Sequence, residues 1–194
     1  MSMHRDQVLK MLIPHVGLDD IVVAVYQSCF DWLALYPRDL NYVAVGAMGQ
    51  ASSHGLGLAL ANPDRRVFVF DGDGSLLMNL GSLVTIAGAG VQNYYHFLFV
   101  NRTYEVNGHQ PLPGSAHLDF AALARAAGYV GARNIDDFPE LNHTLGDMLA
   151  KSGPQFASLE IVPGEIYPPR YDYIHSREAR ETFREALNAR RHES

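Results

Sequence analysis

The feature that most constrains the fold is an alternation of short apolar runs with segments of helical spacing. Five runs rich in β-branched and aromatic residues are expected to be strands, at 21–26, 42–45, 67–70, 94–100 and 156–162. Between them, apolar residues recur every three or four positions or small residues dominate, at 6–13, 51–61, 76–87, 119–127 and 137–151. Such an order predicts a mostly parallel central sheet covered by helices on both faces. The predicted fold is therefore a three-layer α/β/α arrangement.

The chain is expected to form one domain over residues 1–194. Its 194 residues contain no internal repeat, low-complexity tract or linker, and they suffice for a substantial core. A proline-rich connector at 163–169 precedes a predicted helix at 177–190. This helix forms the main part of an expected C-terminal extension at about 170–194.

Composition excludes several classes of function. The net charge is −6, and the basic residues of 177–191 alternate with glutamates, so no nucleic-acid partner is expected. The single cysteine, Cys29, rules out an intramolecular disulfide and a metal site of several cysteines. No apolar run reaches the ~18 residues of a membrane span, and residues 1–10 lack a signal-peptide core. A cytoplasmic protein without membrane contact is expected.

The loop at 71–75 reads Asp-Gly-Asp-Gly-Ser between a predicted strand and a helix. Its glycines allow a tight turn and close approach of a ligand, and free amides at a helix start favour an anion. Asp73 places a carboxylate beside those amides. The two are compatible if a hard divalent cation bridges them, so a diphosphate with Mg²⁺ is predicted. The alternative is an ordinary strand-to-helix turn with Asp and Ser as caps.

Two further loops follow predicted strands and extend this site. Asn101 follows the strand at 94–100; if that strand neighbours the one before Asp73, an amide oxygen and a carboxylate reach the same crevice, as Mg²⁺ prefers. The alternative for Asn101 is a turn-initiating role. The loop 46–50 places Met48 between glycines, which suits backbone close to a ring system, or else a tight turn with Met48 in the core.

Together these loops resemble the signature of thiamine-diphosphate-dependent enzymes. Residues 72–75 followed by Asn101 resemble the diphosphate and metal motif, and residues 46–49 resemble a second part of the same site. Residues 45–66 and 101–111 look like phosphonopyruvate decarboxylases and the β subunit of sulfopyruvate decarboxylase. The resemblance is strongest over residues 43–113. It implies the thiamine-diphosphate-binding fold, with thiamine diphosphate and Mg²⁺ as cofactors.

The resemblance also implies roles for the matched positions. Asp73 and Asn101 would bind Mg²⁺ through side-chain oxygens, and Thr103 through its backbone carbonyl. The carbonyl of Gly46 would accept from the aminopyrimidine, and Met48 would hold the cofactor bent. The residues expected to contact the cofactor are Gln27, Ser28, Gly46, Met48, Gly72, Gly74, Ser75 and Tyr104.

His109 departs from the subgroup pattern, which usually has glycine there. Near the expected mouth of the site, it could contact substrate or transfer a proton. The alternative is a solvated or hydrogen-bonded loop histidine. His109 and Arg102 are also the candidates on this chain for binding an extra anionic group on the substrate.

Full-length members of this family carry a second α/β domain, which supplies the glutamate that protonates the cofactor's pyrimidine ring. Neither Glu105 nor Glu160 is expected to replace it. We therefore expect a β-type subunit that needs an α-type partner with the pyrimidine-binding domain and the catalytic glutamate. The expected assembly is a hetero-oligomer, α2β2 or larger.

The implied activity is decarboxylation of a 2-oxo acid to CO2 and an aldehyde. Subgroup resemblance favours 3-sulfopyruvate, 3-phosphonopyruvate or a similar substrate. One alternative is a carboligase subunit, similar to acetolactate synthase, which would yield acyloins. The other is a non-catalytic cofactor-binding or regulatory subunit, although the complete set of Gly46, Met48, Asp73 and Asn101 argues against a decayed site.

Overall fold

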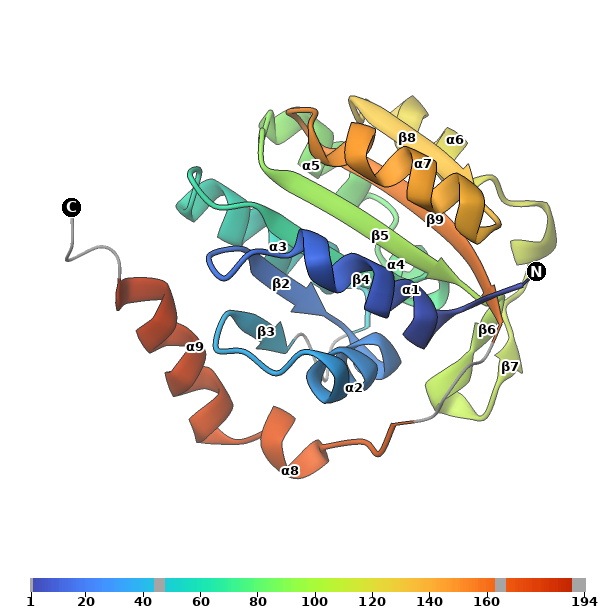
Figure 1. The fold of residues 1–194 in the computed structure, drawn as a ribbon. Coiled ribbons are helices and arrows are strands. Elements are labelled where there is room, and N and C mark those ends of the chain that lie inside the picture. Colours follow the sequence, from blue (N-terminus) through green and yellow to red (C-terminus); the bar gives the residue numbers. More distant parts are fainter. Residues whose placement is uncertain (1, 44–47, 163–166, 190–194) are drawn as a thin grey trace.

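The computed structural model describes residues 2–43, 48–162 and 167–189, and a parallel sheet runs through this part of the chain (Figure 1). Its strands follow the order β1-β9-β5-β4-β2-β3, and β8 also pairs with β9. All the pairings in this sheet are parallel. The strands are β1 (Met3–His4), β2 (Ile21–Ala24), β3 (Asn41–Val43), β4 (Val67–Gly72), β5 (Tyr94–Val100), β8 (Gly131–Ile135) and β9 (Gln155–Val162).

Helices cover both faces of this sheet, which confirms the predicted three layers (Figure 1). One face packs against α1 (Arg5–Leu12), α2 (Tyr26–Leu35) and α7 (Phe138–Leu149). The other face packs against α3 (Ala51–Ala61), α4 (Asp73–Met78), α5 (Ser82–Ala89) and α6 (Phe120–Ala127). The short α8 (Tyr171–Ile174) leads into α9 (Arg177–Ala189), whose Phe183 packs edge-on against Tyr42 of β3 at 5.2 Å between ring centroids. None of the described helices is long and apolar enough to span a membrane.

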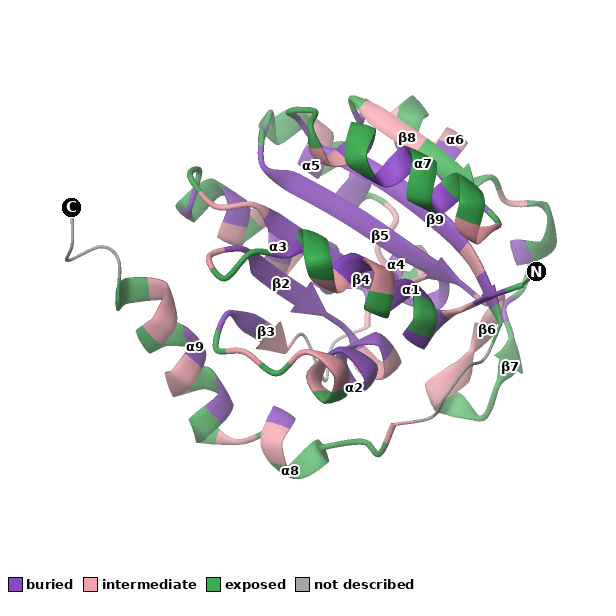
Figure 2. Cartoon of the chain, in the orientation of Figure 1, coloured by how far each residue is buried: buried purple, intermediate pink, exposed green. Residues whose placement is uncertain are grey.

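The central strands are buried on both faces, as their nearly continuous apolar runs predict (Figure 2). Phe68 and Phe70 of β4 belong to the core under α1, α2 and α7. Val67 and Val69 of the same strand belong to the core under α3 to α6. The alternation of side chains along the strand therefore divides the apolar residues between two cores.

The order of the strands places a crevice next to β2. From β2 the chain first moves outward to β3 and then crosses back to β4 on the other side of β2. In open parallel sheets, ligands bind where the strand order reverses, outside the carboxyl ends of the strands. The ends of β2, β4 and β5 lie side by side, because β4 pairs with both of the others. The condition under which Asp73 and Asn101 reach the same crevice, that their strands are neighbours, is therefore met.

Two predicted elements end differently in the structure. The expected strand 21–26 stops at Ala24, and Tyr26 instead opens α2 with a φ of 45°, a left-handed conformation that turns the chain out of the sheet. The expected helix 76–87 is divided into α4 and α5. Asn79 ends α4 at this break and Gly81 precedes α5, and both residue types have a low helix propensity.

Among the described elements of the three layers, three were not predicted. Strand β8 lies beside β9 with Arg133 and Asn134 exposed, so it has no apolar run to reveal it. Strand β1 has only two residues. Helix α2 buries five consecutive residues, Ser28 to Trp32, of which Ser28 and Asp31 are polar, and it therefore lacks a clean helical period.

Candidate functional site

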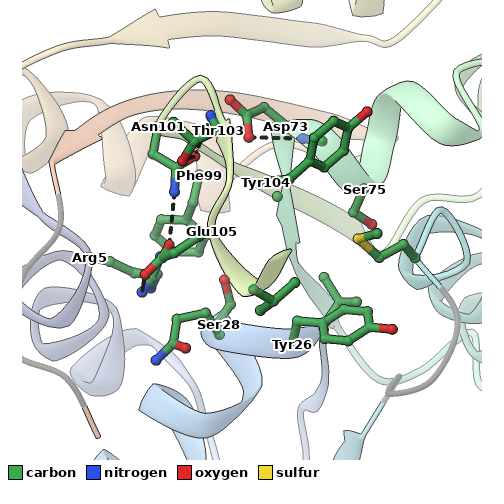
Figure 3. Close-up of a pocket in the computed structure, with 16 residues that line it drawn as sticks. Arg5, Tyr26, Ser28, Asp73, Ser75, Phe99, Asn101, Thr103, Tyr104 and Glu105 are labelled. Carbon is green, nitrogen blue, oxygen red and sulfur yellow. Dashed lines mark hydrogen bonds and ion pairs between the residues drawn. The ribbon is translucent and has the colours of Figure 1, made fainter. Parts of the chain in front are cut away.

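A pocket lies at the carboxyl ends of β2, β4 and β5, where the fold predicts a ligand (Figure 3). Most of the residues assigned to the cofactor from sequence line it together. These are Gln27, Ser28, Met48, Gly72, Asp73, Gly74, Ser75, Asn101, Thr103 and Tyr104. Gly46 lies outside the described residues. The structure thus brings the distant loops into one site, while the contacts of each residue with a cofactor stay a prediction.

Asp73 is the buried acid of this pocket. It is the first residue of α4, and only 2% of its surface is exposed. Its Oδ2 accepts a hydrogen bond from the backbone N–H of Arg102 at 2.7 Å, and its Oδ1 from that of Gly74 at 2.8 Å. Burial raises the pKa of Asp73 to about 6, although these amides oppose the shift. The amides satisfy only part of the buried charge, so a cation would stabilise the carboxylate further.

The turn into α4 is shaped by close contact with Tyr104. A Cβ atom on Gly74 would lie 2.7 Å from both Cδ1 and Cε1 of the Tyr104 ring, so glycine is required for the observed packing. Tyr104 belongs to β6 (Thr103–Tyr104), which pairs with β7 (Gln110–Pro111) in a small antiparallel hairpin. This hairpin therefore packs against the turn after β4.

Hydrogen bonds fix the loop after β3 to α4. The backbone N–H of Gly49 donates to Ser75 Oγ at 3.0 Å, and Asn79 Nδ2 donates to the Gly49 carbonyl at 2.9 Å. Gly49 has a φ of 83°, which glycine adopts readily. Ser75 and Asn79 therefore place Met48 at the pocket wall, a role for Asn79 that sequence reasoning missed.

Asn101 is held at both ends of its side-chain amide. Its Nδ2 donates to Glu105 Oε2 at 2.8 Å. Its Oδ1 accepts from the backbone N–H of Thr103 at 3.0 Å and from Thr103 Oγ1 at 3.1 Å. The chain turns sharply directly after Asn101, because Arg102 has a φ of 58°. The amide thus has a defined orientation, with its oxygen on the side of Thr103.

A buried ion network lies behind Asn101 and was not predicted. Arg5 donates to Asp31 Oδ2 through Nε at 2.6 Å, and to both carboxylate oxygens of Glu105 at 2.7 and 3.0 Å. The exposed fractions of the side chains are 6% for Arg5, 1% for Asp31 and 16% for Glu105. Gln27 also donates to Asp31, at 2.8 Å. Arg5 is the only cationic side chain among the described residues that line the pocket.

The two candidates for an extra substrate anion lie elsewhere. The guanidinium of Arg102 donates to Glu160 at 2.5 Å and to the carbonyl of Ser115, and Arg102 is not among the residues lining the pocket. His109 is exposed, has a φ of 57°, and also lies outside the lining. In this structure the pocket therefore does not receive either side chain.

Comparison with known proteins gives a consistent family match. Residues 27–159 match the family model described as "Thiamine pyrophosphate enzyme, C-terminal TPP binding domain". A phosphonopyruvate decarboxylase of Streptomyces viridochromogenes is 37% identical over 163 residues, which cover 84% of this chain but only 41% of that protein. A sulfopyruvate decarboxylase subunit beta of Methanothermobacter thermautotrophicus is 41% identical over 132 residues, covering 68% of each chain.

A solved structure supports the fold. The thiamine diphosphate-dependent 4-hydroxybenzoylformate decarboxylase of Rhodococcus jostii RHA1 matches with a TM-score of 0.69 at 20% sequence identity. The match covers 84% of this chain and 33% of that one. At this level of identity the likeness extends to the fold alone.

Proposed function

Since the chain belongs to the thiamine pyrophosphate enzymes, through their C-terminal TPP binding domain, we propose that it is the β-type subunit of a split 2-oxo acid decarboxylase. Thiamine pyrophosphate is thiamine diphosphate under another name. The proposed substrate is 3-sulfopyruvate, 3-phosphonopyruvate or a similar 2-oxo acid, and the products are CO2 and an aldehyde. The names and coverage of the relatives support this assignment, since one is a sulfopyruvate decarboxylase subunit beta and another a phosphonopyruvate decarboxylase.

The observation that carries the proposal is the pair Asp73 and Asn101 on adjacent loops after β4 and β5. Carboxylate and amide oxygens are the ligands that Mg²⁺ prefers, and the Asp73 carboxylate is buried in the pocket with backbone amides as its hydrogen-bond donors. The residues present therefore fit a diphosphate bound through a divalent ion. We assign the ion to Asp73, Asn101 and the carbonyl of Thr103.

The remaining pocket residues would hold the organic part of the cofactor. We assign the diphosphate to Gly72, Gly74 and Ser75 at the start of α4 and to Gln27 and Ser28 at the start of α2. Met48 and Tyr104, which also line the pocket, would pack against the cofactor, and the Gly46 carbonyl would accept from its aminopyrimidine. When bound, the cofactor supplies the electron sink that cleavage of the carbon–carbon bond of a 2-oxo acid requires.

We propose that the glutamate acting on the pyrimidine ring comes from an α-type partner chain. Among the described residues that line the pocket, Glu105 is the one glutamate, but it accepts hydrogen bonds from Arg5 and Asn101. A carboxylate engaged in this way is poorly placed to exchange a proton with a ligand. A partner in an α2β2 or larger assembly would supply the free glutamate.

Calorimetry tests this function directly. Thiamine diphosphate titrated into the protein with excess Mg²⁺ is expected to bind saturably, and EDTA is expected to abolish binding. Thiamine without its diphosphate should bind far more weakly, because the proposed contacts of this chain are mainly with the diphosphate and its cation. Equal binding of both compounds, or binding that persists in EDTA, would contradict the assignment.

A further inference from the structure

The buried network of Arg5, Asp31 and Glu105 links the first helix of the chain to the loop after β5. Arg5 opens α1, Asp31 lies on α2 and Glu105 follows the β6 strand. The Arg5 guanidinium donates to Asp31 at 2.6 Å through Nε and to Glu105 through both terminal nitrogens, at 2.7 and 3.0 Å. This two-pronged geometry holds a carboxylate in one orientation.

Glu105 transmits that orientation to Asn101. Its Oε2 accepts from Asn101 Nδ2 at 2.8 Å while also accepting from Arg5 (Figure 3). A side-chain amide can rotate to exchange its oxygen and nitrogen, but only the oxygen can bind a cation. An acceptor at the nitrogen end therefore selects the rotamer with the oxygen on the opposite side. There, the Asn101 oxygen accepts from Thr103 Oγ1. This hydroxyl can rotate away and leave a lone pair of the Asn101 oxygen free for a cation.

We propose that Glu105, held by Arg5, is a positioning residue that keeps the Asn101 oxygen available to the divalent cation. This inference rests on the proposed function, since it specifies how this chain prepares its cation ligand. Asp31 acts one step further away: it accepts from both Arg5 and Gln27 and fixes the guanidinium from behind.

Arg5 also determines whether Glu105 binds the cation itself or accepts from Asn101. Both Glu105 and Asp73 line the pocket, so an unpaired Glu105 would itself be a hard oxygen ligand for the cation. The bidentate pairing with Arg5 engages both oxygens of that carboxylate and directs one of them to Asn101. Hydrogen-bond partners of metal ligands typically contribute 10- to 100-fold to metal affinity.

The test measures cation binding rather than turnover. Mn²⁺ replaces Mg²⁺, and electron paramagnetic resonance reports free Mn²⁺ during a titration at fixed, saturating thiamine diphosphate. For Glu105→Met the expected result is a Mn²⁺ dissociation constant about 10- to 100-fold higher than in the wild type. Glu105→Gln should recover much of this loss, because an amide oxygen at the Oε2 position still accepts from Asn101 and from one Arg5 nitrogen.

The same readout tests whether Arg5 acts through Glu105. Arg5→Met alone should change Mn²⁺ affinity, because it frees Glu105 from its pairing. The double variant Arg5→Met/Glu105→Met should bind Mn²⁺ as Glu105→Met does, because Arg5 acts only through Glu105. Lys10→Met is the control: it removes a cation from the same helix, where Lys10 pairs with Asp6 at 2.9 Å, away from the pocket lining. Its Mn²⁺ affinity should equal that of the wild type.

The outcomes separate this inference from the proposed function. If the wild type binds Mn²⁺ and thiamine diphosphate saturably and Glu105→Met binds Mn²⁺ with the same affinity, the positioning role alone is overturned. Effects of Arg5→Met and Glu105→Met that simply add, with no recovery in Glu105→Gln, would also overturn it, since they indicate general loss of packing. Failure of the wild type to bind the pair would overturn the proposed function and this inference together. Should Glu105→Met fail to fold, Glu105→Gln and Arg5→Lys carry the same comparison with smaller expected losses. Arg5→Lys replaces the two-pronged guanidinium by a single ammonium group and keeps the charge.

Discussion

Asp73 combines burial, two backbone donors and a raised pKa in one side chain. Raising the carboxyl pKa from 3.8 to about 6 corresponds to about 3 kcal/mol of cost for the charged form in the protein without a cation. Asp73→Asn removes that cost and replaces the charged carboxylate ligand by a neutral amide oxygen. We expect Mg²⁺-dependent binding of thiamine diphosphate to be strongly weakened but still measurable, while the melting temperature is unchanged or higher. Unchanged calorimetric affinity in this variant would contradict the role of Asp73.

The raised pKa of Asp73 also predicts how pH acts. Because its folded-state pKa, about 6, lies above the ordinary 3.8, the cost of charging it is absent below pH ~4 and fully present above pH ~6. A cation needs the charged form, so its affinity should fall roughly tenfold per pH unit below pH 6. Calorimetry from pH 5 to pH 8 measures this, and Asp73→Asn serves as the control without a pH-dependent loss at this position. A flat affinity profile in the wild type would contradict the prediction.

Substitution of His109 tests how far the site extends beyond the pocket lining. It is exposed, lies outside the pocket lining, and has a left-handed φ of 57°. His109→Gly should leave cofactor affinity unchanged and raise stability by up to about 1 kcal/mol, because glycine adopts this conformation without strain. We also expect an altered ranking of 2-oxo acid substrates if His109 contacts substrate. A wild-type ranking in a substrate panel would contradict that role.

The candidate site could be predicted from sequence where its residues directly follow strands. Asp73 and Asn101 were found because parallel strands bring their carboxyl ends to one edge. Arg5 and Glu105 were missed, since they lie 100 positions apart and only the tertiary fold pairs them. One signal was present: Arg5 precedes Val8, Leu9 and Leu12 at the spacing of a single helix face, so a charge on the apolar side of α1 needed a buried partner.

At the level of elements, the sequence predicted the strands and helices whose apolar or small residues recur regularly or form a continuous run. Strand β5 and helix α3 have the expected limits. Strand β8 could not be found, because a polar edge strand is defined by its neighbour rather than by its own composition. The break between α4 and α5 depends on Asn79, whose side chain bonds the Gly49 carbonyl and so is explained only by tertiary contact.

Helix α3 shows how close packing constrains an element. A Cβ atom on Gly55 would lie 2.4 Å from Val69 Cγ2 and 3.1 Å from Tyr94 Cε2, so α3 lies unusually near β4. Gly55→Ala should therefore destabilise the protein by about 1–3 kcal/mol through overpacking. Gly57 is the matched control on the same helix: it is exposed with open space around its Cβ position, and Gly57→Ala should stabilise by about 0.5–1 kcal/mol. Equal effects of the two substitutions in chemical denaturation would contradict this account.

At the scale of the whole molecule, the chain spans 41% of a phosphonopyruvate decarboxylase but 68% of a sulfopyruvate decarboxylase subunit beta. The three-layer fold and its family could be predicted from sequence, because the alternation of strands with helices and the loop motifs are encoded locally. The identity of the expected partner could not, since nothing in one chain specifies the surface of another. The proposed partner and substrate therefore need an experiment on the assembled protein.

The most direct measurement is to purify the tagged chain gently from its native host, identify co-purifying chains by mass spectrometry, and assay the same sample for CO2 release. We expect a second chain with a pyrimidine-binding domain, bound thiamine diphosphate, and decarboxylation of 3-sulfopyruvate or 3-phosphonopyruvate in the presence of Mg²⁺. Acyloins in place of aldehydes would indicate a carboligase. A chain that emerges alone, without thiamine diphosphate and inactive on every 2-oxo acid tested, would contradict the account of a split decarboxylase.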